Sequence, residues 1–145
     1  MINRDFREFI ELLNKNDVKY LVVGGYALAF HGYPRFTKDI DFWVWVDKVN
    51  AGKIMRTLQE FGFSSLDISE EDFLSPGYVV QLGQPPARID LLTSVTGLEF
   101  EECYASRVHV DIQGVEIDFV DLESFKKNKK AVGRHQDLAD LENLE

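Results

Sequence analysis

Three aspartates stand inside apolar segments, where carboxylates are uncommon. Asp39 and Asp41 open the run DIDFWVWV, and Asp90 lies within RIDLL. Both runs have the length and the aliphatic or aromatic content of β-strands. Successive side chains of a strand alternate between its two faces, so Asp39 and Asp41 are expected to point the same way. At about 5 Å two carboxylates repel by roughly 3 kcal/mol at an effective dielectric near 20, so retaining both calls for a nearby cation or for water.

Two interpretations of these aspartates remain open. In the plainer one, Asp39 and Asp41 lie at a solvated strand start, and Asp90 reaches water or pairs with Arg88 at a strand end. In the other, the strands are neighbours and the three carboxylates form an oxygen-rich site, which suits Mg²⁺ or Mn²⁺. No His/Cys spacing indicates zinc. We therefore take Asp39, Asp41 and Asp90 as candidate metal ligands and catalytic residues.

Two glycines precede this segment. Gly24 and Gly25 follow the apolar run KYLVV and come before a short helical pattern. Glycine lets the backbone approach a ligand closely, and the N–H groups of a helix's first turn favour phosphate. A tight strand-to-helix turn without a ligand is the alternative interpretation.

Taken together, these features resemble the polymerase-β-like nucleotidyltransferase superfamily. In its nucleotidyltransferase AbiEii toxin-like branch, Gly-Gly-x-Ala is followed by His or Tyr-Gly and then by Arg-x-Thr-x-Asp-Ile-Asp. The matching residues here are Gly24, Gly25, Ala27, His31, Gly32, Arg35, Thr37, Asp39, Ile40 and Asp41. Such proteins often end with Lys and then Gly-Arg-x-x-Asp-Leu-x-Asp-Leu, which is matched by Lys129, Gly133, Arg134, Asp137, Leu138, Asp140 and Leu141.

The resemblance implies a metal-dependent nucleotidyltransferase. It would move a nucleoside monophosphate from a nucleoside triphosphate to a hydroxyl of RNA, protein or a small molecule, with Mg²⁺ or Mn²⁺ as cofactor. It also implies a toxin–antitoxin component with a partner protein from a neighbouring gene. The alternative is a regulatory or antitoxin-like partner that binds nucleotide and metal without turnover. The implied nucleotide-binding residues are Gly24, Gly25, Arg35, Thr37, Lys38, Lys129 and Arg134.

The basic residues of the tail have a plainer interpretation as well. Lys129 and Arg134 belong to a cationic stretch whose spacing is also that of a solvated helix surface. His31, close to the aspartates in sequence, is expected to pack the short helix against the following loop, with nucleotide contact as the alternative. Asp137 and Asp140 are expected to orient Arg134 or to cap a helix rather than to bind metal.

Positioning these residues requires an α/β (α+β) fold in which helices pack on a mixed β-sheet, as in the nucleotidyltransferase fold. Hydrophobic periodicity predicts helices over 4–16, 26–31, 51–61, 121–130 and 134–144, the last with its leucines inward. Strands are predicted over 19–23, 39–46, 78–82, 88–92, 107–112 and 115–120. The last two flank Gln113-Gly114 and predict a hairpin, and Asp121 is a plausible N-cap.

Length and composition indicate one domain over residues 1–145, with a core over about 18–92 and C-terminal helices over about 121–144. The net charge of −9 argues against a bulk electrostatic attraction to nucleic acid. A single cysteine, Cys103, fits a reducing compartment. The sequence shows no charged-then-apolar leader and no apolar run near 20 residues, so a cytoplasmic location away from membranes is expected.

Overall fold

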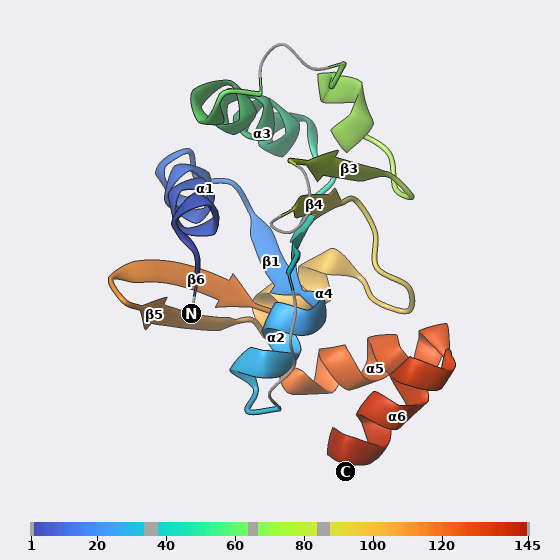
Figure 1. Ribbon diagram of the computed structural model, residues 1–145. Coiled ribbons are helices and arrows are strands. Elements are labelled where there is room, and N and C mark those ends of the chain that lie inside the picture. The colour runs from blue at the N-terminus through green and yellow to red at the C-terminus, as the bar shows by residue number, and fades with distance from the viewer. Residues whose placement is uncertain (1, 34–37, 64–66, 84–87, 145) are drawn as a thin grey trace.

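The computed structural model describes residues 2–33, 38–63, 67–83 and 88–144 (Figure 1). Helices and strands alternate along the first half of the chain, and a hairpin and two helices follow. In chain order the elements are α1 (Arg4–Lys15), β1 (Tyr20–Val23), α2 (Gly24–Phe30), β2 (Ile40–Val44), α3 (Lys48–Phe61), the 3₁₀ helix η1 (Glu70–Phe73), β3 (Val79–Leu82), β4 (Ile89–Leu92), α4 (Phe100–Ala105), β5 (Val108–Ile112), β6 (Val115–Phe119), α5 (Leu122–Val132) and α6 (His135–Leu144).

The strands form one six-stranded mixed sheet in the order β3-β4-β2-β1-β6-β5. Strands β2 and β4 run parallel, as do β1 and β6, and the other three neighbouring pairs are antiparallel. The mixed sheet predicted from the sequence is therefore confirmed. The two central strands, β1 and β2, are almost fully buried, which matches their apolar sequences.

The alternation of β2 separates two layers of the molecule. Phe42 packs against the rings of Phe9 and Tyr20, on the side covered by α1. Trp43 faces the other way and contacts Phe100 of α4 at 5.1 Å between ring centroids. Helix α5 joins this second layer, and Figure 1 shows α5 and α6 far from α1 and α3.

The predicted hairpin and caps are also present. Strands β5 and β6 pair antiparallel around Gln113 and Gly114, which both have positive φ (54° and 86°). This is the backbone of a two-residue turn that matches the strand twist. The Asp121 side chain accepts a hydrogen bond from the Ser124 N–H and caps α5, and Gly133 ends that helix in the left-handed conformation.

Three details differ from expectation. The short second helix begins at Gly24 rather than at residue 26. Helix α4 was not predicted, because six residues are too few to show a helical period. Leu138 of α6 is 49% exposed, so the expected inward row of leucines is wrong at this position. Within the described ranges, no helix is long and apolar enough to cross a membrane.

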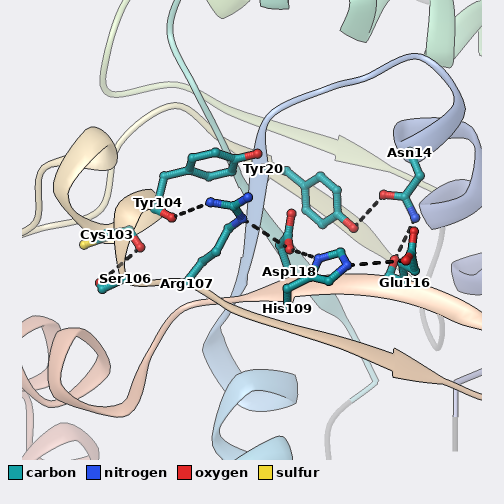
Figure 2. Close-up of polar contacts among 9 residues, drawn as sticks. All are labelled: Asn14, Tyr20, Cys103, Tyr104, Ser106, Arg107, His109, Glu116 and Asp118. Atoms are coloured by element: carbon teal, nitrogen blue, oxygen red, sulfur yellow. Dashed lines mark hydrogen bonds and ion pairs between the residues drawn. The ribbon is translucent and has the colours of Figure 1, made fainter.

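A polar network ties the hairpin to the helices on either side of the sheet (Figure 2). The buried Tyr20 hydroxyl donates to Asn14 Oδ1 at 3.0 Å, and the His109 ring is hydrogen-bonded to Asp118 across the hairpin. Arg107 reaches the same aspartate with its Nε at 3.4 Å from Oδ1. Asn14 also donates from Nδ2 to the Glu116 carbonyl at 2.6 Å, so α1 links β1 to the hairpin at the end of the sheet opposite to β3 and β4.

Candidate functional site

The parallel pairing of β2 with β4 brings two of the predicted aspartates side by side. Asp41 is the second residue of β2 and Asp90 the second residue of β4, and their Cα atoms are register partners. On the other side of β2, the antiparallel register places Asp41 opposite Val23, the last residue of β1. The two carboxylates therefore start neighbouring strands next to the β1–α2 turn.

The pKa of Asp41 reflects its burial and its closeness to other carboxylates. Its pKa is raised from 3.8 to about 7, first by burial and then by the negative charge of Asp90 and a hydrogen bond with the Asp90 side chain. The charge of Asp39 raises this pKa further, while Arg88 lowers it. Strongly raised carboxyl pKa values from like charges are typical of sites that hold a proton or a cation.

The cation within this cluster is Arg88. Its Nε donates to Asp90 Oδ1 at 2.9 Å and its Nη2 donates to Asp90 Oδ2 at 3.2 Å. The same guanidinium lies 3.2 Å from Asp39 Oδ2. The side chain of Asp90 is only 9% exposed, so this pairing offsets the cost of burying its charge.

The donor set suits a hard divalent cation, because every candidate ligand is a carboxylate oxygen. In the described part of the chain, however, no three aspartate, glutamate, histidine or cysteine side chains are arranged to hold a metal ion as they stand. Arg88 is paired with Asp39 and Asp90 at once. A metal on this donor set requires these two carboxylates to release the guanidinium.

Gly24 lies directly against the site. It has a φ of +70°, and a Cβ at this position would collide with Asp41 Oδ2. A side chain here would therefore displace the central carboxylate, which explains why this position holds glycine. Gly25 follows it in the first turn of α2 and is partly buried.

The remaining candidates for nucleotide binding are spread over two regions. Arg35 and Thr37 lie outside the described residues. Lys38 is exposed and directly precedes Asp39. His31 Nε2 is hydrogen-bonded to the carbonyl of Val120 at 2.8 Å, so this histidine joins α2 to the residue that follows β6.

Lys129 and Arg134 meet at Asp137. Lys129 Nζ is 3.0 Å from Asp137 Oδ1, and Arg134 donates to Asp137 Oδ2 from Nε at 2.7 Å and from its backbone N–H at 3.2 Å. Asp137 is fully buried, and these partners, Arg134 first, lower its pKa to about 2. The expected role of Asp137 in orienting Arg134 is confirmed, and the Arg134 side chain remains 73% exposed.

From the sequence, Arg88 was expected only as an alternative partner of Asp90. The available signal was its spacing, since a residue two positions before Asp90 on a strand shares its face. What the spacing could not show is that Asp39, from another strand, would reach the same guanidinium.

Comparison with known proteins finds one matching family model and solved structures of similar fold. A family model described as nucleotidyl transferase of unknown function (DUF2204) matches residues 2–145. A crystal structure of a candidate nucleotidyltransferase from Thermotoga maritima aligns with a TM-score of 0.66 and 20% identity, covering 97% of this chain and 90% of that one. An antigenic nucleotidyltransferase-like protein from Paracoccidioides brasiliensis aligns with a TM-score of 0.56 and 17% identity, covering 93% and 71%. At these identities the two structures show the fold. No curated protein sequence matches the chain.

Proposed function

Because the chain belongs to this nucleotidyl transferase family, we propose that it moves a nucleoside monophosphate from a nucleoside triphosphate to a hydroxyl, with Mg²⁺ or Mn²⁺ bound at Asp39, Asp41 and Asp90. The observation that carries the proposal is the meeting of the three carboxylates around one cation, Arg88, beside the β1–α2 turn. Nothing else in the described structure gathers carboxylates of different strands in this way.

In this reaction the acceptor oxygen attacks the α-phosphorus of the triphosphate. The bond from that phosphorus to the bridging oxygen breaks, and pyrophosphate leaves with the bonding electrons. The hydroxyl proton passes to Asp41, whose raised pKa of about 7 suits a general base near neutral pH. When bound, the divalent metal supplies charge stabilisation for the triphosphate and acidifies the attacking hydroxyl.

The proposal also assigns Arg88 a contact with the triphosphate. With a divalent cation held by Asp39 and Asp90, the Arg88 guanidinium would be free to contact a triphosphate. A planar fork suits phosphate oxygens, which it can contact at two points. Gly24 and Gly25 offer backbone to the same group, and Arg35, Thr37, Lys38, Lys129 and Arg134 are the further candidates for phosphate contact.

The direct test is transfer itself. The protein is incubated with each labelled triphosphate and Mg²⁺, together with total cellular RNA or protein, and the transferred label is measured. Asp41→Asn and Asp90→Asn should abolish the signal, and Arg107→Ala, at the far end of the sheet, should retain it. Label that persists in both aspartate variants would rule out this site.

A second candidate function is nucleotide and metal binding without turnover, in a regulatory or antitoxin-like protein. The ion pairs of Arg88 with Asp39 and Asp90 favour it, because they hold two of the three carboxylates away from a metal. Triphosphate binding that depends on Mg²⁺ but releases no pyrophosphate would identify this function. In either case, we propose that the protein acts in the cytoplasm with a partner from a neighbouring gene, as part of a toxin–antitoxin pair.

A further inference from the structure

An open groove of about 800 Å³ lies on the α4 side of the sheet. Its aromatic residues are Trp43, Trp45 and Phe100, and its acidic residues are Glu99, Glu101 and Glu102. Trp43, at 2% exposure, closes the bottom, and the three glutamates are exposed. Among the described residues that line the groove, none is lysine, arginine or histidine. The groove therefore combines an apolar floor with a negative rim.

One residue of the groove, Trp43, lies close to Asp41 along β2. Trp43 follows Asp41 by two residues in β2, so the two side chains share a face of the sheet and their Cα atoms are about 7 Å apart along the strand. Trp45 continues in the same direction, away from the carboxylates. A molecule that presents a hydroxyl to Asp41 and Asp90 would thus extend its body along the tryptophans.

The same surface already receives one lysine. The ammonium of Lys19 lies 4.5 Å from the ring centroid of Trp45 and 5.8 Å from that of Tyr104. Lysine and arginine combine an apolar stem with a cationic head, which matches an aromatic floor beneath an acidic rim. The negative charge of the rim repels the phosphate backbone of a nucleic acid.

We propose that this groove binds the acceptor, and that the acceptor is a segment of another protein in which lysine or arginine flanks a serine or threonine hydroxyl. The inference rests on the proposed nucleotidyl transfer for the role of the hydroxyl. The binding itself requires neither nucleotide nor metal. It can therefore be tested, and can fail, independently of transfer.

Tryptophan fluorescence gives a local readout, because the chain contains two tryptophans and both line the groove. The probe is a synthetic peptide of alternating lysine and serine, titrated into the full-length protein without nucleotide. Its acetyl-lysine form has the same backbone without the charges. We expect saturable binding of the charged peptide, weakening at high salt, and binding of the acetylated form that is weaker by about tenfold or more.

Two double variants each remove two negative charges, one pair on the rim of the groove and one pair on η1. Glu101→Gln/Glu102→Gln removes two rim charges and should weaken peptide binding about tenfold. Glu70→Gln/Glu71→Gln removes two exposed charges on η1, remote from the lining, and should leave it unchanged. Equal binding of charged and acetylated peptides, equal loss in both double variants, tighter binding of polyuridylate than of peptide, or equally tight binding of spermidine would each overturn the proposal. If peptide binding behaves as expected and no label is transferred in the presence of triphosphate, nucleotidyl transfer fails while the binding site stands.

Discussion

Arg88, the residue directly before β4, holds Asp90 through two hydrogen bonds, with Nε 2.9 Å from Oδ1 and Nη2 3.2 Å from Oδ2. Its third contact, to Asp39 at 3.2 Å, comes from the segment that leads into β2. One guanidinium thus neutralises carboxylates from two parts of the sheet, on the donor set proposed for the metal. Metal and arginine should therefore compete.

The first prediction concerns this competition. Arg88→Ala should lower the free energy of unfolding without metal by about 1–3 kcal/mol, because it leaves the buried Asp90 charge unpaired. It should also tighten Mg²⁺ binding and enlarge the rise in melting temperature that Mg²⁺ causes. Melting curves with and without Mg²⁺ measure both effects. Arg107→Ala, which removes a comparable ion pair with Asp118, is the control and should leave the Mg²⁺ response unaltered. A lost Mg²⁺ response in Arg88→Ala would mean that the arginine supports the metal instead of excluding it.

The second prediction follows from the raised pKa of Asp41. The folded protein keeps this proton up to about pH 7, whereas the unfolded chain releases it near pH 4. Between these values the native state binds more protons, so stability falls as pH rises from about 4 to 7. Asp41→Asn should remove this fall and raise metal-free stability at pH 8 by a few kcal/mol, because each pKa unit corresponds to about 1.4 kcal/mol.

Denaturant titrations of both proteins at pH 5 and pH 8 measure the difference. Comparison with Asp41→Asn is necessary because His109 contributes a slope of the same sign. Its pKa is raised by Asp118 and Glu116, so its stabilisation is present below pH 6.5 and lost as pH rises through the folded value. Both proteins retain His109, and its contribution cancels. Parallel pH profiles for wild type and Asp41→Asn would show that Asp41 has an ordinary pKa.

The third prediction uses Gly24. Gly24→Ala should displace the Asp41 carboxylate as well as strain the backbone, because φ is +70° and the new Cβ would meet Oδ2. Gly62→Ala is a matched control, with φ of +97° and open space around its Cβ position. Each should cost about 1 kcal/mol or more in stability. Only Gly24→Ala should also reduce the Mg²⁺-induced rise in melting temperature, measured by thermal melts. An equal Mg²⁺ response in the two variants would remove Gly24 from the site.

The fourth prediction separates binding from stability in the tail. Arg134→Ala should weaken triphosphate affinity by about 1.5–3 kcal/mol, the scale of a charged hydrogen bond, and less so at high salt. Because the Arg134 side chain is 73% exposed, its ion pair should contribute at most about 1 kcal/mol to stability. Titration calorimetry with Mg²⁺ present measures the affinity. Equal affinity in wild type and Arg134→Ala would leave this arginine as a solvated surface residue.

Asp137→Asn provides the contrasting variant. This carboxylate is buried between Lys129 and Arg134, so its loss should cost about 2–4 kcal/mol of unfolding free energy. Its depressed pKa also predicts that the wild type loses this stabilisation in acid, as pH falls from about 4 towards 2. A pH series followed by circular dichroism would reveal the loss. A variant with wild-type stability at neutral pH would contradict the role assigned to the network.

The sequence predicted those parts of the structure that depend on local chemistry. Alternation placed Asp41 and Trp43 on one face, Gln113-Gly114 indicated a tight hairpin, and Asp121 marked the start of α5. What it could not supply was register between distant strands. The pairing of Asp41 with Asp90, and hence the shared contact of Arg88 with Asp39, exists only once β2 and β4 are aligned.

The groove could not be predicted from the sequence for a related reason. The aromatic residues of 42–45 are divided between the core and the surface of the groove, which the sequence alone does not show. Phe42 is buried against α1, while Trp43 and Trp45 line the opening beside α4. That opening depends on α4, a helix too short to be visible in the hydrophobic pattern.

Because β6 is a neighbour of β1 in the sheet, the nascent chain leaves β1 incompletely paired until β6 has been synthesised. All three site aspartates have been synthesised once residue 90 is made, but one edge of β1 stays open until Phe119 pairs with Val22. A ribosome adding about 5–20 residues per second needs roughly 5–20 s to synthesise the stretch of about 100 residues from Val22 to Phe119. During that interval the apolar strand Tyr20–Val23 presents an unpaired edge to the cytosol. A nascent chain stalled between residues 92 and 115 should therefore be a preferred client of ribosome-associated chaperones, whereas one extended well beyond residue 120 should release them.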